Sequence, residues 1–219
     1  MTDQNVEGVD VSSHQGNVDW SAISQDGVGF VFVRASIGGH QVDAHFASNW
    51  SRVGDAGLMR GAYHYFWPLT AWQDQADNFI NAVGNLQAGD LPPALDLEGA
   101  LASNDPRKPK GWLDVPIDQR LPMIHNWLNA VEQTVGIKPV IYTRQNFIEG
   151  LLGDGIQELA DYPLWIAHYD VLQPTLPASW SSWSFWQYTE KGAVRGIIGN
   201  VDRDKFNGSL NDLKALAKS

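Results

Sequence analysis

Two carboxylates two positions apart, Asp96 and Glu98, are the sharpest chemical signal in the sequence, at the end of an apolar run that begins at Ala94. Residues i and i+2 of a strand point to the same face, so these two side chains should lie side by side. Mutual repulsion and partial burial then raise the pKa of one carboxyl, which leaves a protonated acid beside an ionised partner. Cleavage of a glycosidic bond uses such a pair. The alternative is a structural pair satisfied by loop amides or by Arg34.

Two further carboxylates stand at predicted strand ends, Asp10 in Gly8-Val9-Asp10-Val11-Ser12 and Asp202 in Gly199-Asn200-Val201-Asp202. Each of them, taken singly, could cap a turn or a helix. The first and eighth strands of a closed barrel are neighbours, however, so Asp10 and Asp202 would lie close together. We therefore predict one catalytic set: Glu98, Asp96, Asp10 and Asp202.

A metal site is the rival use of four carboxylates. The six histidines show neither a His-x-His nor a His-Glu-x-x-His spacing. We predict no metal and no cofactor, although a magnesium or calcium site built only from oxygen ligands stays open as an alternative. Among the histidines, His64 is the one expected to face the site, because it lies on the third predicted strand between two tyrosines.

The chain has 24 aromatic residues, ten of them Trp, and most must be buried in the hydrophobic core. A subset near strand ends could stack on sugar rings. The predicted substrate-binding residues are Tyr63, Phe66, Tyr142, Trp186, Gln187 and His64. Strand alternation places Trp186 and Gln187 on opposite faces, so they cannot both line the mouth of a barrel.

Short apolar, β-branched runs alternate with helix-like segments along the chain, and this alternation is what would position the acids. The predicted strands cover residues 6–11, 28–35, 60–66, 93–98, 139–143, 164–169, 184–188 and 194–201. The predicted helices cover 71–83, 117–135 and 210–217, with a weaker pattern at 46–56. Eight strands alternating with helices favour an α/β fold, a modified (β/α)8 TIM-type barrel with its site at the carboxyl ends of the strands.

The length of 219 residues is short for this architecture, which typically needs about 250. Some flanking helices should therefore be missing, and we place the degenerate units at 169–183 and 189–195. No repeat or linker divides the chain, so we predict one catalytic barrel over 1–219 without a wall-binding domain. The longest irregular stretch, 99–116, directly follows the fourth strand and could be functional.

Composition excludes several classes of protein. There is no cysteine, which rules out disulfide scaffolds and thiol nucleophiles. The 25 acidic residues outnumber the 15 basic ones and give a formal charge of -10, which argues against nucleic acid and anionic membranes as partners. The first residues lack the features of a secretory signal peptide, and no stretch of 18 apolar residues suggests membrane insertion.

Several motifs in register resemble the glycoside hydrolase family 25 lysozymes, the Chalaropsis-type or cellosyl-like muramidases. The resemblance covers about residues 6–207. The motifs are Gly8-Val9-Asp10-Val11-Ser12-Ser13-His14-Gln15-Gly16, Gly61-Ala62-Tyr63-His64-Tyr65-Phe66, Leu95-Asp96-Leu97-Glu98, Trp186-Gln187-Tyr188 and Val201-Asp202.

The resemblance implies hydrolysis of the β-1,4 bond between N-acetylmuramic acid and N-acetylglucosamine in bacterial peptidoglycan, with retention of configuration. It makes Glu98 the general acid, Asp96 its partner, and Asp10 and Asp202 supporting acids, with Tyr63 as the active-site tyrosine. Whether Asp96 is a nucleophile or orients the substrate's N-acetyl group is left open. We expect a monomer that acts outside the cytoplasm on glycan strands, its delivery route undefined. The alternatives are an endoglycosidase for chitin-like glycans and a catalytically silent glycan-binding barrel.

Overall fold

The computed structural model describes residues 5–99 and 111–219. Its strands are β1 (Val6–Val11), β2 (Val28–Ile37), β3 (Gln41–Val42), β4 (Met59–Tyr65), β5 (Ala94–Asp96), β6 (Val140–Thr143), β7 (Leu164–Ala167), β8 (Phe185–Gly192) and β9 (Val201–Phe206). They pair in the order β1-β9-β8-β7-β6-β5-β4-β2-β3, and a further pairing of β1 with β2 closes the ring. Eight of these described strands thus form a barrel, with β3 appended to β2, which confirms the predicted barrel.

The barrel is mixed rather than all parallel. Neighbouring pairs from β1–β2 round to β7–β8 are parallel, whereas β9 runs antiparallel to both β8 and β1. The predicted eighth strand at 194–201 is therefore wrong, because those residues form the turn and β9 begins only at Val201. A parallel strand needs a crossover of a dozen or more residues, and the link from Gly192 to Val201 is too short for one.

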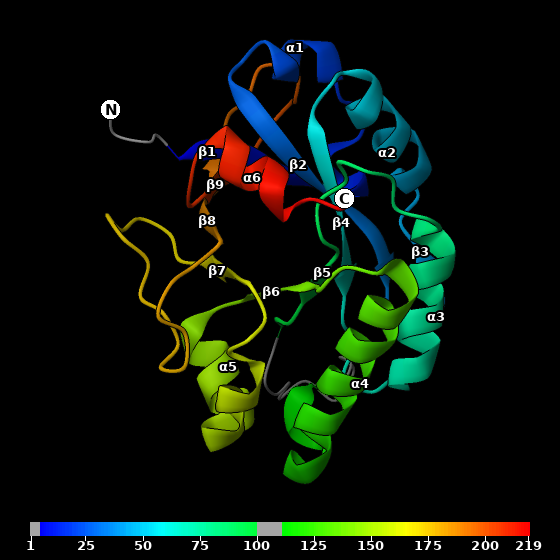
Figure 1. Cartoon of the computed structure of the whole chain (residues 1–219), viewed down its shortest axis with the longest axis vertical. Helices are drawn as coiled ribbons and strands as arrows, with labels where there is room; N and C mark the ends of the chain where they lie inside the picture. The colour runs from blue at the N-terminus through cyan, green and yellow to red at the C-terminus, as the bar shows by residue number, and fades with distance from the viewer. Residues whose placement is uncertain (1–4, 100–110) are drawn as a thin grey trace.

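The described helices are α1 (Trp20–Ser24), α2 (Phe46–Asp55), α3 (Trp72–Val83), α4 (Ile117–Val135), α5 (Gln145–Leu152) and α6 (Leu210–Leu216), with 3-10 turns at Ser13–Gln15, Trp112–Asp114 and Gly153–Leu159. Figure 1 shows α2, α3 and α4 along one side of the barrel and loops on the side of β7 and β8. Residues 169–183 and 189–195 form no helix, as the sequence predicted, and the first four residues of the second range belong to β8. Helix α5 was not predicted.

Alternating strand residues divide the core into two clusters. The inner cluster fills the barrel with aromatic rings, and Trp165 stacks on Phe32 with 4.4 Å between ring centroids. Glycines on the neighbouring strands leave space for the phenylalanine rings of β2: a Cβ on Gly61 would lie 2.4 Å from the Phe32 ring, and one on Gly8 would lie 2.3 Å from the Phe30 ring. The interior is therefore a packed core, and a ligand would bind near its rim.

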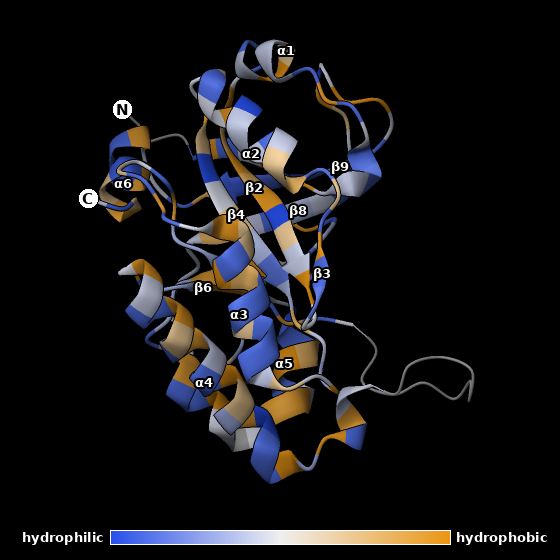
Figure 2. Ribbon diagram, turned by 90° about the vertical axis from the view of Figure 1, so that its right-hand side faces the viewer, coloured by the Kyte–Doolittle hydropathy of each residue, from blue (hydrophilic) through white to orange (hydrophobic). Residues whose placement is uncertain are grey.

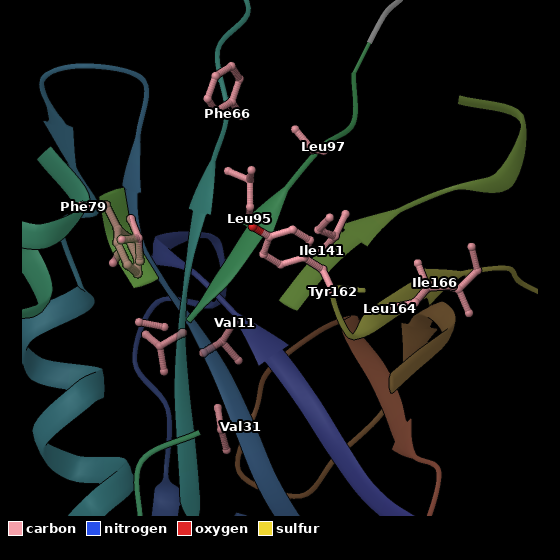
Figure 3. Packing of buried hydrophobic residues seen from close by; sticks show 14 of the residues in the cluster. Val11, Val31, Phe66, Phe79, Leu95, Leu97, Ile141, Tyr162, Leu164 and Ile166 are labelled. Carbon is pink, nitrogen blue, oxygen red and sulfur yellow. The ribbon is translucent and has the colours of Figure 1, made fainter. Parts of the chain in front are cut away.

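The outer cluster joins the barrel wall to the helices. Figure 3 shows Leu95, Ile141 and Ile166 on neighbouring strands, all on the outer face. The helices meet this face with apolar sides, as the orange and blue sides of α3 and α4 indicate (Figure 2). Fully buried Phe79 of α3 packs on fully buried Trp127 of α4, with 5.4 Å between ring centroids. This packing fixes the position of the strands that carry the inward-facing polar residues.

Candidate active site

A pocket of about 340 Å³ opens at the carboxyl ends of the parallel strands. Its lining residues are Asp10, Val11, Ser12, His14, Gln15, Arg34, Tyr63, Tyr65, Asp96, Glu98, Tyr142, Trp165, Gln187 and Asp202. The structure thus gathers all four predicted acids in one place. Asp202 reaches this end although β9 is reversed, because the first residues of an antiparallel strand lie beside the last residues of its neighbours.

The pair Asp96 and Glu98 follows the predicted alternation, with Leu95 and Leu97 fully buried in the outer cluster. Asp96 ends β5 and is only 6% exposed, whereas Glu98 is half-buried and closer to solvent. Burial raises the pKa of Asp96 well above its ordinary value, and the neighbouring Glu98 charge raises it further. Burial also raises the pKa of Glu98. The pair therefore keeps a proton at a pH where isolated carboxyls have lost theirs.

Asp10 and Asp202 are directly opposite each other in the β1–β9 ladder. Burial raises the pKa of Asp10 well above its ordinary value, with Asp204 and then Asp202 adding to the effect. Burial raises the pKa of Asp202 as well. Three carboxylates this close resist joint ionisation, so the cluster retains a proton to a higher pH than isolated carboxyls do.

Asp204 is the acid that sequence reasoning missed. It is fully buried inside the barrel, where its Oδ1 accepts a hydrogen bond of 2.8 Å from the Trp165 indole. Its Oδ2 has no hydrogen-bond partner among the described residues. The spacing could have indicated it, since Asp202 and Asp204 are two positions apart, as Asp96 and Glu98 are. The predicted eighth strand ended at residue 201, before either of them, so the pattern was not recognised.

Gln187 lies at the centre of a hydrogen-bond network. Its Oε1 accepts from the phenols of Tyr142, at 2.8 Å, and Tyr169, at 2.5 Å. Its Nε2 donates to Oδ2 of Asp10 at 2.7 Å. The Tyr169 phenol oxygen in turn accepts from Nη2 of Arg144 at 3.1 Å. Gln187 and Tyr142 thus lie at the pocket as predicted, but both are tied to other protein groups.

Tyr63 lies on the inner face of β4 and lines the pocket with its ring edge towards Trp165. Burial raises the pKa of Tyr63 well above its ordinary value, so its phenol stays protonated and can donate a hydrogen bond. Tyr65, two residues on, shares this face and was not predicted; burial and the Asp96 charge raise the pKa of its phenol to about 12.

Three of the predicted substrate-binding residues point away from the pocket. His64, Phe66 and Trp186 do not line the pocket. Since successive strand residues alternate, His64 must face away from Tyr63, and Trp186 away from Gln187. The three side chains are packed instead into the layer beneath the helices and loops.

His64 and Phe66 have clear structural roles in that layer. Fully buried His64 pairs through Nδ1 with Ser36 Oγ at 2.8 Å and through Nε2 with Gln75 Oε1 at 3.2 Å. Burial lowers the pKa of His64 to about 4, so it is neutral at pH 7. Phe66 stacks on Trp112 with 5.4 Å between ring centroids.

Two arginines supply positive charge at the mouth. Arg34 lines the pocket and forms an ion pair of 2.9 Å with Asp43. Arg144 lines a second hollow of about 440 Å³, where it stacks over the Tyr169 ring at 5.1 Å. Both charges act to lower the pKa of Asp96 against the effect of burial. Most of the predicted functional loop at 99–116 lies outside the described residues, which resume at Gly111.

No group of three or more His, Cys, Asp or Glu side chains within 5–99 and 111–219 is arranged to hold a metal ion. In the same ranges, no helix has the length and apolar character needed to cross a bilayer.

A closed barrel with paired carboxylates at the carboxyl ends of its strands has the site of a glycoside hydrolase. The family model "Glycosyl hydrolases family 25" matches residues 9–197, and the chain belongs to this family.

Relatives and solved structures agree with this assignment. Lysozyme M1 of Streptomyces globisporus is 33% identical, over 98% of this chain and 72% of its own. The N,O-diacetylmuramidase of Chalaropsis sp is 28% identical, over 97% of this chain and 99% of its own. The crystal structure of the bacterial lysozyme from Streptomyces coelicolor matches with a TM-score of 0.89 and 33% identity, covering 98% of this chain and 97% of that one.

Proposed function

We propose that this protein is a muramidase that hydrolyses the β-1,4 bond between N-acetylmuramic acid and N-acetylglucosamine in bacterial peptidoglycan. The observation that carries the proposal is the coupled pair Asp96 and Glu98 at the mouth of a family 25 barrel. The names of two relatives, a lysozyme and an N,O-diacetylmuramidase, support the substrate. The substrate lies in the cell wall, so the protein would act outside the cytoplasm, and we propose that it does so as a monomer.

In the proposed reaction, Glu98 is the general acid. It is the more exposed member of the pair, so it can reach the glycosidic oxygen, and its raised pKa keeps the proton available. Proton transfer to the leaving oxygen accompanies cleavage of the bond to the anomeric carbon. Such a proton transfer contributes typically 10² to 10⁴-fold to the rate.

The proposed reaction places the pair's proton on Glu98 and leaves Asp96 ionised, a state that the Arg34 and Arg144 charges favour. Ionised Asp96 stabilises the positive charge that develops on the sugar. Its Oδ1 is buried without a hydrogen-bond partner among the described residues, so an acceptor is ready for a group of the substrate. We propose that the configuration is retained, either because Asp96 attacks the anomeric carbon or because it orients the substrate's acetamido group to do so. Water then resolves the intermediate, with ionised Glu98 as the general base. Proton NMR of the first-formed anomer tests retention.

The tyrosines are proposed as neutral contacts to the sugar. The Tyr63 phenol has no hydrogen-bond partner among the described residues and lines the same pocket as the acids, so it can donate to a hydroxyl or acetamido oxygen of the glycan. Tyr142 offers an aromatic edge at the pocket, since its hydroxyl is used by Gln187.

Digestion of purified peptidoglycan tests the proposal. The products are reduced with borohydride and identified by mass spectrometry. The proposal predicts reducing ends on muramic acid, at an unchanged rate in EDTA. Reducing ends on N-acetylglucosamine, or activity only on chitin-like polymers, would replace it with a related endoglycosidase. Tight binding without released fragments would identify a silent glycan-binding barrel.

A further inference from the structure

The amide of Gln187 is fixed in one orientation by groups on three other strands or strand ends. The side chain is only 2% exposed. The Tyr169 oxygen accepts a hydrogen bond from Arg144, so its own hydrogen is directed to Gln187 Oε1, where Tyr142 also donates. With Oε1 saturated by two donors, the amide nitrogen must face Asp10.

This orientation favours one oxygen of Asp10 as the site of a proton. Its Oδ2 accepts from Gln187 at 2.7 Å and is the weaker site for a proton, so a proton on Asp10 is favoured on Oδ1. Asp202, its partner directly opposite in the β1–β9 ladder, is within hydrogen-bonding reach of Asp10. A proton on Oδ1 is therefore donated towards β9 and is held away from β8.

We propose that Gln187 is a positioning residue of the reaction: it directs the shared proton of the Asp10 cluster towards β9 and thereby keeps Asp202 ionised opposite Glu98. This inference rests on the proposed muramidase function. It replaces the predicted role of Gln187 as a substrate contact, because both ends of its amide are already hydrogen-bonded to protein groups.

The link to the general acid is electrostatic. Burial raises the pKa of Asp202, and the hydrogen bond from Asp10 acts in the opposite direction and favours its carboxylate. The Asp202 charge, after burial, raises the pKa of Glu98. The charged and titratable groups around Asp10 and Glu98 are Asp202 and Asp204 on β9, Asp96 at β5, Arg34 on β2, Tyr63 and Tyr65 on β4, Tyr142 and Arg144 at β6, Tyr169 after β7, and Glu190 on β8.

The substitution Gln187→Met should shift the pH dependence of kcat/KM in a defined direction. It removes the donor to Asp10, so the proton can move to Oδ2 and the bond to Asp202 is lost. Asp202 then accepts a proton more readily. Once neutral, it no longer raises the pKa of Glu98, so that pKa falls. The alkaline limb of kcat/KM should move to lower pH by about 0.5 to 1 unit, which is up to about tenfold in rate at a fixed pH on that limb.

A second variant keeps the proposal testable if Gln187→Met folds poorly. Removing one phenol, in Tyr142→Phe or Tyr169→Phe, leaves the other to hold the amide, so the limb should stay in place. The double variant frees the amide to rotate and should reproduce the shift of Gln187→Met. Gln133→Met, on the exposed side of α4, is the matched control.

The experiment measures kcat and KM of muropeptide release from pH 4 to 9 for each variant, with thermal melts at every pH. A downward shift of the limb in both Gln187→Met and the double tyrosine variant, with KM within about twofold of wild type, supports the inference. A limb that coincides with wild type, or a raised KM with the limb unmoved, overturns it. Wild type that releases no fragments refutes the muramidase proposal instead, so the two failures are distinct.

Discussion

Asp204→Asn should stabilise the protein at neutral pH, although it alters a fully buried side chain. Asp204 Oδ2 has no hydrogen-bond partner among the described residues, and burial raises the pKa of the carboxyl well above its ordinary value. An asparagine can keep the bond from the Trp165 indole through its oxygen. Its amide nitrogen can donate to Asp10, so the uncompensated oxygen disappears.

The magnitude follows from the cost of the unsatisfied oxygen. A buried polar atom without a partner costs about 1–3 kcal/mol, and more if charged. For a chain of 219 residues, each kcal/mol moves the Tm by about 2–4 °C. We therefore expect the Tm of Asp204→Asn to exceed that of wild type by about 2–12 °C at pH 7.

The difference in Tm between Asp204→Asn and wild type should grow as the pH rises. Because the folded pKa of Asp204 is raised, the folded state holds a proton that the unfolded chain loses above about pH 4. Wild-type stability therefore falls as pH rises from there to the folded pKa. Below pH 4 the carboxyl is protonated in both states, so the variant and wild type should melt together.

Differential scanning calorimetry at about pH 3 and at pH 8 measures both effects, with the exposed Asp77→Asn as the matched control. Equal Tm values for Asp204→Asn and wild type at pH 8, or a lower Tm for the variant at pH 8, would refute the reasoning that Asp204 is a destabilised buried acid.

Three further predictions concern packing, contact and charge. Gly61→Ala should lower stability by about 1–3 kcal/mol in urea unfolding, because its Cβ would lie 2.4 Å from the Phe32 ring. Tyr63→Phe should lower kcat/KM in the muropeptide assay, whereas Trp186→Phe should leave KM unchanged, because only Tyr63 lines the pocket. Arg144→Met should move the alkaline limb of kcat/KM to higher pH, since the arginine's charge lowers the pKa of Glu98; an unmoved or lowered limb contradicts this.

Strand alternation allowed much of the site to be predicted from sequence. It placed Asp96 and Glu98 together, and ring closure brought Asp10 to Asp202. Both inferences depend only on local periodicity and on the closure of the sheet.

The remainder of the site depends on strand direction and on long-range contacts. Asp204 was missed because a short link forced the last strand to reverse and to begin later than predicted. The role of Gln187 depends on phenols 18 and 45 residues away, which no local pattern shows. His64 was expected to face the site because it lies between two tyrosines. Strand alternation puts it instead on the outer face of the barrel, where it stacks on Trp127 of the outer cluster.

The removal of the acidic proton of Glu98 tests the central claim most directly. Glu98→Gln keeps the shape of the half-buried side chain but cannot protonate the glycosidic oxygen. We predict that kcat for muropeptide release from purified peptidoglycan falls at least about 10²-fold, with the Tm no lower than in wild type. Glu158→Gln, on the surface of the Gly153–Leu159 turn, should retain full activity. A folded Glu98→Gln that turns over at the wild-type rate would contradict the account.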